Sequence, residues 1–152
     1  MEFANLYEHG FVRVAACTLP ITLVQPARNA EAVAAIAREC AAEGVALAVF
    51  PELCLTGYSI EDLLLNDTVL DAADDAVGAL AEATADLDVV IVAGAPLRSL
   101  NRLYNCAVVL HRGEILGVVP KTYLPNYREF YERRQIAPGD DVTGEIHLAG
   151  RD

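Results

Sequence analysis

Residues 29–52 read NAEAVAAIARECAAEGVALAVFPE, and this stretch decides the fold. Its first part has a candidate N-cap, Asn29, then apolar residues at helical spacing, and Gly44 stands where such a helix would end. Its second part, residues 45–50, is a continuous apolar run of strand length. A helix that leads directly into a buried strand predicts a βαβ unit with parallel strands and a right-handed crossover.

Further strand signals lie on both sides of this unit. Residues 11–18, FVRVAACT, predict a first, largely buried strand, and residues 89–93 predict a third. Residues 104–110 and 115–119 flank a short His-Arg-Gly-Glu segment and therefore predict a hairpin. Parallel strands joined to an antiparallel hairpin predict a mixed sheet and an α/β fold.

Two more helices are expected between the second and third strands. Ser59 followed by Asp62 is a near-match to a capping box and predicts a short helix there. Residues 67–86, rich in alanine with acidic residues spaced along them, predict a second long helix with a solvated face. Residues 144–152 begin as another strand and turn. We therefore expect residues 1–152 to be part of one domain that continues further.

Composition excludes several classes of function. With 54% hydrophobic residues the chain has enough apolar side chains for a core, and its net charge of −11 opposes binding to nucleic acid or anionic membranes. The longest apolar stretch, residues 89–97, is too short to span a bilayer, and the N-terminus lacks the basic start of a signal peptide. Four scattered cysteines without CxxC spacing are typical of reduced thiols. We expect a cytoplasmic protein without a metal site.

Two apolar runs end in the same way, one in Pro51-Glu52 and the other in Pro120-Lys121. Proline cannot donate a ladder hydrogen bond, so each proline marks where strand pairing gives way to a loop. Lys121 is the only lysine in the chain, which argues against a solubilising role. A carboxylate and an amine delivered to one sheet edge suggest a catalytic pair. The alternatives are a structural ion pair or two charges that simply point into water.

Aromatic and charged residues alternate in residues 122–140, TYLPNYREFYERRQIAPGD. Tyr127, Phe130 and Tyr131 stand at positions i, i+3 and i+4, which fits an amphipathic helix with its aromatic face on the core. The functional alternative is a pocket lid whose aromatic faces enclose a small substrate while a hydroxyl orients it. Both interpretations remain open from the sequence alone.

Several blocks of the chain resemble the nitrilase superfamily of carbon-nitrogen hydrolases. The blocks are FPELCLTGYS around Glu52, GAPL from residue 94, YNCAVV from residue 104, and GVVPKTYLPNYREFYERRQ around Lys121. The opening YEHGFVRVAAC and the SIEDLL block are most similar to the N-terminal glutaminase domains of bacterial glutamine-dependent NAD synthetases. The resemblance implies the N-terminal part of an αββα sandwich that carries a Glu-Lys-Cys triad.

By this resemblance, Glu52 would be the general base and Lys121 would orient the site and stabilise the developing oxyanion. Glu132 matches a second glutamate that supports these groups. Tyr127 resembles a glutamine-binding tyrosine, with Tyr58 and Phe130 as further candidates for the walls of the substrate pocket. The resemblance thus implies that a cysteine thiolate attacks the glutamine amide and releases ammonia.

The triad cysteine is the point at which this chain departs from the pattern, because no cysteine follows Lys121. Cys54 stands two residues after Glu52 and is the local alternative as nucleophile. The other three, Cys17, Cys40 and Cys106, fall in predicted strands or a predicted helix and fit small buried apolar residues. The chain therefore has the features of a glutaminase domain without its nucleophile.

Two functions follow from these observations. The first is an amidohydrolase module that acts on glutamine and feeds ammonia to a synthetase domain, with ATP and magnesium bound only by that domain and a homo-oligomer in the full-length form. The present chain has no Gly-rich phosphate loop and is expected to bind no cofactor itself. The second is an inactive fragment or pseudoenzyme that serves as a scaffold, and another amidase of the superfamily also remains open.

Overall fold

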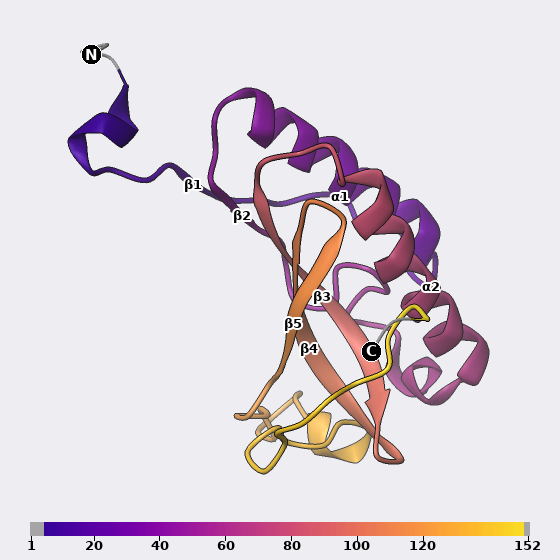
Figure 1. The fold of residues 1–152 in the computed structure, drawn as a ribbon. Helices are drawn as coiled ribbons and strands as arrows, with labels where there is room; N and C mark the ends of the chain where they lie inside the picture. Colours follow the sequence, from indigo (N-terminus) through magenta and orange to yellow (C-terminus); the bar gives the residue numbers. More distant parts are fainter. Residues whose placement is uncertain (1–4, 151–152) are drawn as a thin grey trace.

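The computed structural model describes residues 5–150, which form one sheet covered by helices (Figure 1). Of three short 3-10 helices, one precedes the main elements, one lies between them and one follows them. In chain order the elements are η1 (Leu6–His9), β1 (Val14–Ala16), α1 (Pro26–Ala42), β2 (Leu47–Val49), η2 (Glu61–Leu65), α2 (Asp67–Ala83), β3 (Val90–Ser99), β4 (Arg102–His111), β5 (Glu114–Pro120) and η3 (Glu132–Arg134).

The five strands form a mixed sheet in the order β1-β2-β3-β4-β5. β1, β2 and β3 are parallel, whereas β4 runs antiparallel to both β3 and β5. The β4–β5 turn places Arg112 and Gly113 at φ of 48° and 82°, as a two-residue hairpin turn that follows the twist of the strands requires. The predicted α/β class, the parallel βαβ unit and the hairpin are confirmed.

α1 and α2 lie side by side on one face of the sheet and build the core (Figure 1). Their buried alanines and valines meet alternate residues of the strands, such as Ala48, Ile91 and Val108, which are almost completely inaccessible. The chain therefore shows one helix layer on one sheet layer, which is half of the four layers of an αββα sandwich.

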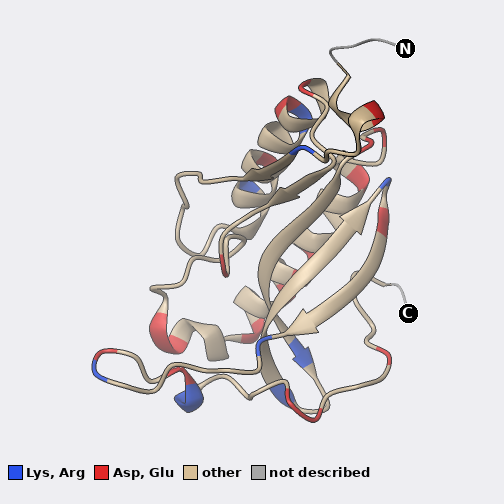
Figure 2. Ribbon diagram, turned by 90° about the vertical axis from the view of Figure 1, so that its left-hand side faces the viewer, with Lys and Arg blue, Asp and Glu red and all other residues tan. Residues whose placement is uncertain are grey.

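The opposite face of the sheet is apolar and open. One row of register partners across it is Ala16, Val49, Val92, Val109 and Gly117, and the exposed Val119 lies in the next row. Figure 2 looks onto this face and shows that its strands carry almost no charge, while acidic residues are spread over helices and loops. No described helix is long and apolar enough to cross a membrane.

The structure corrects the predicted limits of several strands. β1 has three residues instead of the eight in 11–18, and it is exposed, with Val14 63% accessible, because it is an edge strand outside the helix layer. β3 extends beyond residue 93 to Ser99 because its whole length pairs with β4. Of the strand and turn expected in residues 144–152, residues 144–150 form no strand, and only Leu148 makes an isolated bridge, while residues 151 and 152 lie outside the described residues.

The helix signals also need correction. α1 begins at Pro26, and Asn29 lies inside the helix with its buried side chain bonded to Thr22 and Leu55. Pro26 at the first helical position explains the earlier start, since its missing N–H costs nothing there. The Ser59 capping box does not form, and the short helix after it is the 3-10 helix η2.

The aromatic segment does not form the amphipathic helix that its spacing allowed. Residues 121–131 run as extended chain and turns, and only η3 is helical. Tyr127, Phe130 and Tyr131 are exposed instead of packed on the core. The segment ends at the buried Glu132, whose carboxylate bonds to Lys121 at the sheet edge.

Candidate functional site

The loop that carries Glu52 is pressed against β3 at Gly94. A Cβ built at Gly94 would stand 2.3 Å from the Leu53 nitrogen and 2.5 Å from the Pro51 carbonyl oxygen, so only glycine lets these backbones approach. The Leu55 N–H then donates to the Gly94 carbonyl at 3.1 Å. The glycine of the GAPL block therefore fixes the position of Glu52 after β2.

Glu52 and Lys121 meet at the sheet edge, as the sequence predicts. The Lys121 ammonium donates to Glu52 Oε1 at 2.6 Å, although 69 residues separate the two in sequence. Lys121 follows directly after β5, and its backbone N–H donates to the Asn105 carbonyl at 2.8 Å, so strand pairing continues one residue past Pro120. The catalytic-pair geometry is therefore present, and the two charges do not simply point into water.

Glu132 completes a three-residue charge cluster with this pair. Its carboxylate accepts both 3.1 Å hydrogen bonds from the Lys121 ammonium and a 2.6 Å bond from the Tyr58 hydroxyl. The residue is only 6% exposed, so its charge depends on these donors rather than on water. Lys121 thus bridges an almost fully buried carboxylate and the partly exposed one of Glu52.

Two carboxylates decide the charge state of the lysine. Burial of the ammonium lowers the pKa of Lys121, but the hydrogen bonds and charges of Glu52 and Glu132 outweigh it, so that pKa lies above its ordinary value. Burial, together with the Glu132 hydrogen bond and the nearby carboxylates, raises the pKa of Tyr58. Lys121 is therefore a cation and Tyr58 a neutral hydrogen-bond donor at neutral pH.

Asn105 is a member of the cluster that sequence reasoning missed. Its side-chain amide donates to Glu52 Oε1 from β4, and the residue is only 4% exposed. The YNCAVV block contains it, but an asparagine in an apolar strand gave no chemical signal by itself. A buried amide in the middle of such a strand needs a polar partner, and that requirement could have pointed to it.

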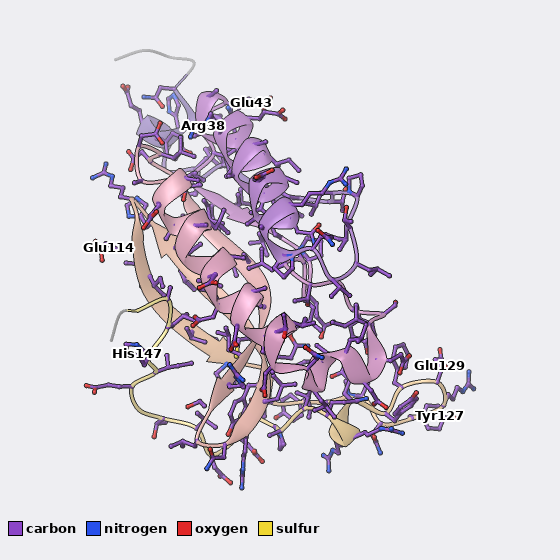
Figure 3. The ribbon with its side chains drawn as sticks, turned by 90° about the vertical axis from the view of Figure 1, so that its right-hand side faces the viewer. Arg38, Glu43, Glu114, Tyr127, Glu129 and His147 are labelled. Carbon is purple, nitrogen blue, oxygen red and sulfur yellow. The ribbon has the colours of Figure 1, made fainter. Side chains whose placement is uncertain are left out.

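The aromatic candidates divide into two groups. Tyr58 contacts Glu132 as described, and the Phe130 ring packs edge-on against the Tyr58 ring with centroids 6.5 Å apart. Tyr127 is 72% exposed and lies under the Arg128 guanidinium, away from the charge cluster, on the loop that projects from the molecule in Figure 3. The structure thus brings Tyr58 and Phe130 toward the site and leaves Tyr127 outside it.

Cavities lie on both sides of the cluster. One of about 270 Å³ borders Tyr58, Phe130 and Glu132, and one of about 390 Å³ lies over the open sheet face beside Glu52 and Lys121. The second is lined by apolar strand residues together with Asn105. Both are open, and the cluster can therefore be reached by a small substrate.

None of the four thiols is placed as a nucleophile. Cys54 turns away from Glu52, accepts from the Gly94 N–H and donates to its carbonyl, and burial raises its pKa to about 11. Burial raises the pKa of Cys106 to about 12. Cys17 and Cys40 face each other at 3.9 Å between the end of β1 and α1. Within residues 5–150 no group of three His, Cys, Asp or Glu could hold a metal ion.

These features define an α/β protein with a Glu–Lys–Glu cluster at the carboxyl edge of its parallel strands. Residues 13–149 match the model of the carbon-nitrogen hydrolase family, and the chain belongs to that family. The nitrilase-type fold expected from the sequence is thereby confirmed.

Relatives in sequence share one description. The chain is 60% identical over all 152 residues to a glutamine-dependent NAD(+) synthetase of Mycobacterium tuberculosis and 59% identical over 148 residues to that of Mycobacterium leprae. It covers 22% of each, so it spans about a fifth of the length of the curated relatives it matches. The matched part is the N-terminal part of these relatives.

Solved structures agree on the fold. A glutamine-dependent NAD(+) synthetase from Cytophaga hutchinsonii superposes with a TM-score of 0.78 at 28% identity, over 84% of this chain and 22% of that one. An amidase from Nesterenkonia sp. gives a TM-score of 0.70 at 21% identity, over 86% of this chain and 51% of that one. The second likeness concerns the fold alone.

Proposed function

We propose that this chain is the glutamine-hydrolysing part of a glutamine-dependent NAD synthetase and supplies the base and the cation for breaking the side-chain amide of glutamine. The proposal rests on the Glu52–Lys121 hydrogen bond, which joins two strand ends that are 69 residues apart in sequence. The 60% identity to relatives named glutamine-dependent NAD(+) synthetase supports glutamine as the substrate.

Glu52 acts as the general base in this mechanism. It takes the proton of a cysteine thiol, and the sulfur electron pair forms a bond to the amide carbon of glutamine. The carbon–nitrogen bond then breaks, and the nitrogen takes the proton from Glu52 and leaves as ammonia. Water activated by the same carboxylate finally cleaves the thioester and releases glutamate.

Lys121 stabilises the oxygen that becomes negative when the sulfur adds. Its raised pKa keeps it protonated, so it donates a hydrogen bond and a full positive charge and does not act as a base. Glu132 holds the ammonium in place from the buried side, and the Tyr58 hydroxyl donates to Glu132 in turn. Phe130 and Tyr58 line the substrate cavity, and Tyr127 would reach the substrate only if its loop moved toward the cluster.

The nucleophile comes from outside this chain in the proposed mechanism, because the four thiols are engaged elsewhere. An amidase from Nesterenkonia sp. AN1 with the same fold carries an acrylamide adduct at its active-site cysteine. We propose that ammonia passes to a synthetase domain beyond residues 1–152, where ATP and magnesium act, and that the whole protein is a homo-oligomer.

The engagement of all four thiols away from Glu52 also favours a second candidate function, an inactive scaffold. A domain without its nucleophile retains the fold and an open apolar sheet face but loses the reaction. In that case the chain would support no turnover in any context. The two candidates therefore differ in what happens when the missing nucleophile is supplied.

The test replaces the N-terminal 152-residue segment of the Mycobacterium tuberculosis relative by this chain and measures glutamate release and NAD formation. We expect the chimaera to use glutamine, Lys121→Arg to abolish that use, and synthesis from free ammonia to continue, because arginine differs in shape and hydration at a compact site. The 152-residue protein alone should release no ammonia from glutamine. A chimaera that works with ammonia but not with glutamine would support the scaffold.

A further inference from the structure

We propose that Asn105 is the positioning residue of the general base and that it determines which oxygen of Glu52 receives the proton. The inference rests on the proposed function, since it assigns a base to the same site. It adds an uncharged, buried residue of β4 to the cluster, and this residue donates to the same carboxylate oxygen as Lys121.

Two residues donate hydrogen bonds to the Glu52 carboxylate, and both donate to the same oxygen. The Lys121 ammonium and the Asn105 side-chain amide each donate to Oε1, whereas no described residue donates to Oε2. Two donors on one oxygen leave its lone pairs engaged, and the remaining oxygen keeps both of its own. With the side chain 41% exposed, Oε2 is the atom that an incoming thiol can reach.

The orientation of the amide follows from chemistry. If the Asn105 oxygen faced Glu52 instead, two acceptors would meet at hydrogen-bond distance within a buried environment, which is strongly unfavourable. The residue is 4% exposed, so water cannot replace the missing donor. The amide nitrogen must therefore point at the carboxylate.

Asn105 also fixes the second member of the pair through its backbone. Its carbonyl accepts the Lys121 N–H at 2.8 Å, while its side chain holds Glu52. One residue of β4 thus sets the positions of a loop after β2 and of a loop after β5. Because β4 pairs directly with β5 and with β3, the neighbour of β2, the spacing of base and cation is set by the sheet.

The variants separate this role from packing. Asn105→Ala removes the donor, and Asn105→Asp keeps the shape but replaces the donor by a second negative charge beside Glu52. Val109→Ala is the matched control, because Val109 lies on the same face of β4 and does not touch the pair. In the Mycobacterium tuberculosis chimaera, ammonia-dependent synthesis serves as the internal control for folding.

We expect Asn105→Ala to lower kcat for glutamate release by about 10- to 100-fold with KM changed less than about threefold, the effect of losing one hydrogen bond to a charged group. Asn105→Asp should lower kcat further, and Val109→Ala should change neither constant appreciably. A rise in KM as large as the fall in kcat would overturn the positioning role. The same fall in kcat in Val109→Ala would also overturn it and would leave only a packing effect.

A second measurement keeps the inference independent of turnover. In the 152-residue protein, the Asn105 side-chain amide protons should resonate downfield of a free asparagine and return toward that value in Glu52→Ala. Identical amide resonances in both proteins would overturn the inference even if the chimaera is active. An inactive chimaera with the expected resonance shift would refute the proposed function but leave the Asn105–Glu52 contact in place.

Discussion

Replacing Lys121 by methionine tests whether the charge cluster is structural as well as chemical. Methionine keeps much of the lysine's length and apolar stem but has no charge, so Glu52 and Glu132 would lose their shared cation. Glu132 is the sensitive partner, since it is 6% exposed and its two 3.1 Å bonds to the ammonium have no substitute in water.

The magnitude follows from these exposures. Removing one partner of a buried ion pair costs about 3–5 kcal/mol, because the other charge stays buried without compensation. Lys121 and Glu52 are partly solvated, which places the expected loss near the lower end, at about 3 kcal/mol. Adding Glu132→Gln removes the stranded charge while its oxygen still accepts from Tyr58, so the double variant should recover about 1–2 kcal/mol.

Urea unfolding of the 152-residue protein, followed by circular dichroism at low concentration, measures both changes. The pH dependence has a defined sign, because the folded pKa of Lys121 lies above its unfolded value of about 10.4. The advantage of the natural protein over Lys121→Met should be complete below that value and shrink as the pH rises through the folded pKa. A loss under about 0.5 kcal/mol, or no recovery in the double variant, would refute the argument by showing a solvated surface pair.

Three further predictions concern the loop, the thiols and the open face. Gly94→Ala should destabilise the protein by about 3 kcal/mol because its Cβ meets backbone atoms, whereas Gly117→Ala, with nothing within 4 Å, should be tolerated; equal unfolding midpoints would contradict the close approach. Iodoacetamide at mildly alkaline pH should leave Cys54 and Cys106 unlabelled until urea is added, as mass spectrometry will show; rapid labelling would contradict their burial. The protein should self-associate in analytical ultracentrifugation and do so less after Val119→Glu, and a monodisperse natural protein would show that the apolar face needs no cover.

The helix and strand order was predictable because it depends on local periodicity. The run that ends at Glu52 has a helix pattern followed by a strand pattern, and the hairpin has Gly113 at a turn position where φ is positive. Boundaries were less predictable, as Asn29 shows. Its short polar side chain suits an N-cap, but a tertiary contact with Leu55 recruits it into the helix instead.

The aromatic segment shows where spacing misleads. Tyr127 and Phe130 have helical spacing, yet the chain there forms turns and extended backbone, and Glu132 at its end bonds to Lys121. A periodic pattern records only what a helix would bury, and it contains no information about a competing long-range ion pair. The exposed position of Tyr127 is the result.

By itself, the sequence determined the α/β class and predicted that Glu52 and Lys121 would meet at one sheet edge, because each directly follows a proline that ends an apolar run. Only the tertiary structure decided that Glu132 is buried against Lys121, that Asn105 shares Glu52 Oε1 with the ammonium, and that Cys54 is turned to Gly94. The reason is physical: residue types and their spacing decide the local backbone conformation, whereas the partner of a buried polar atom depends on strands far apart in the chain that the sheet brings together.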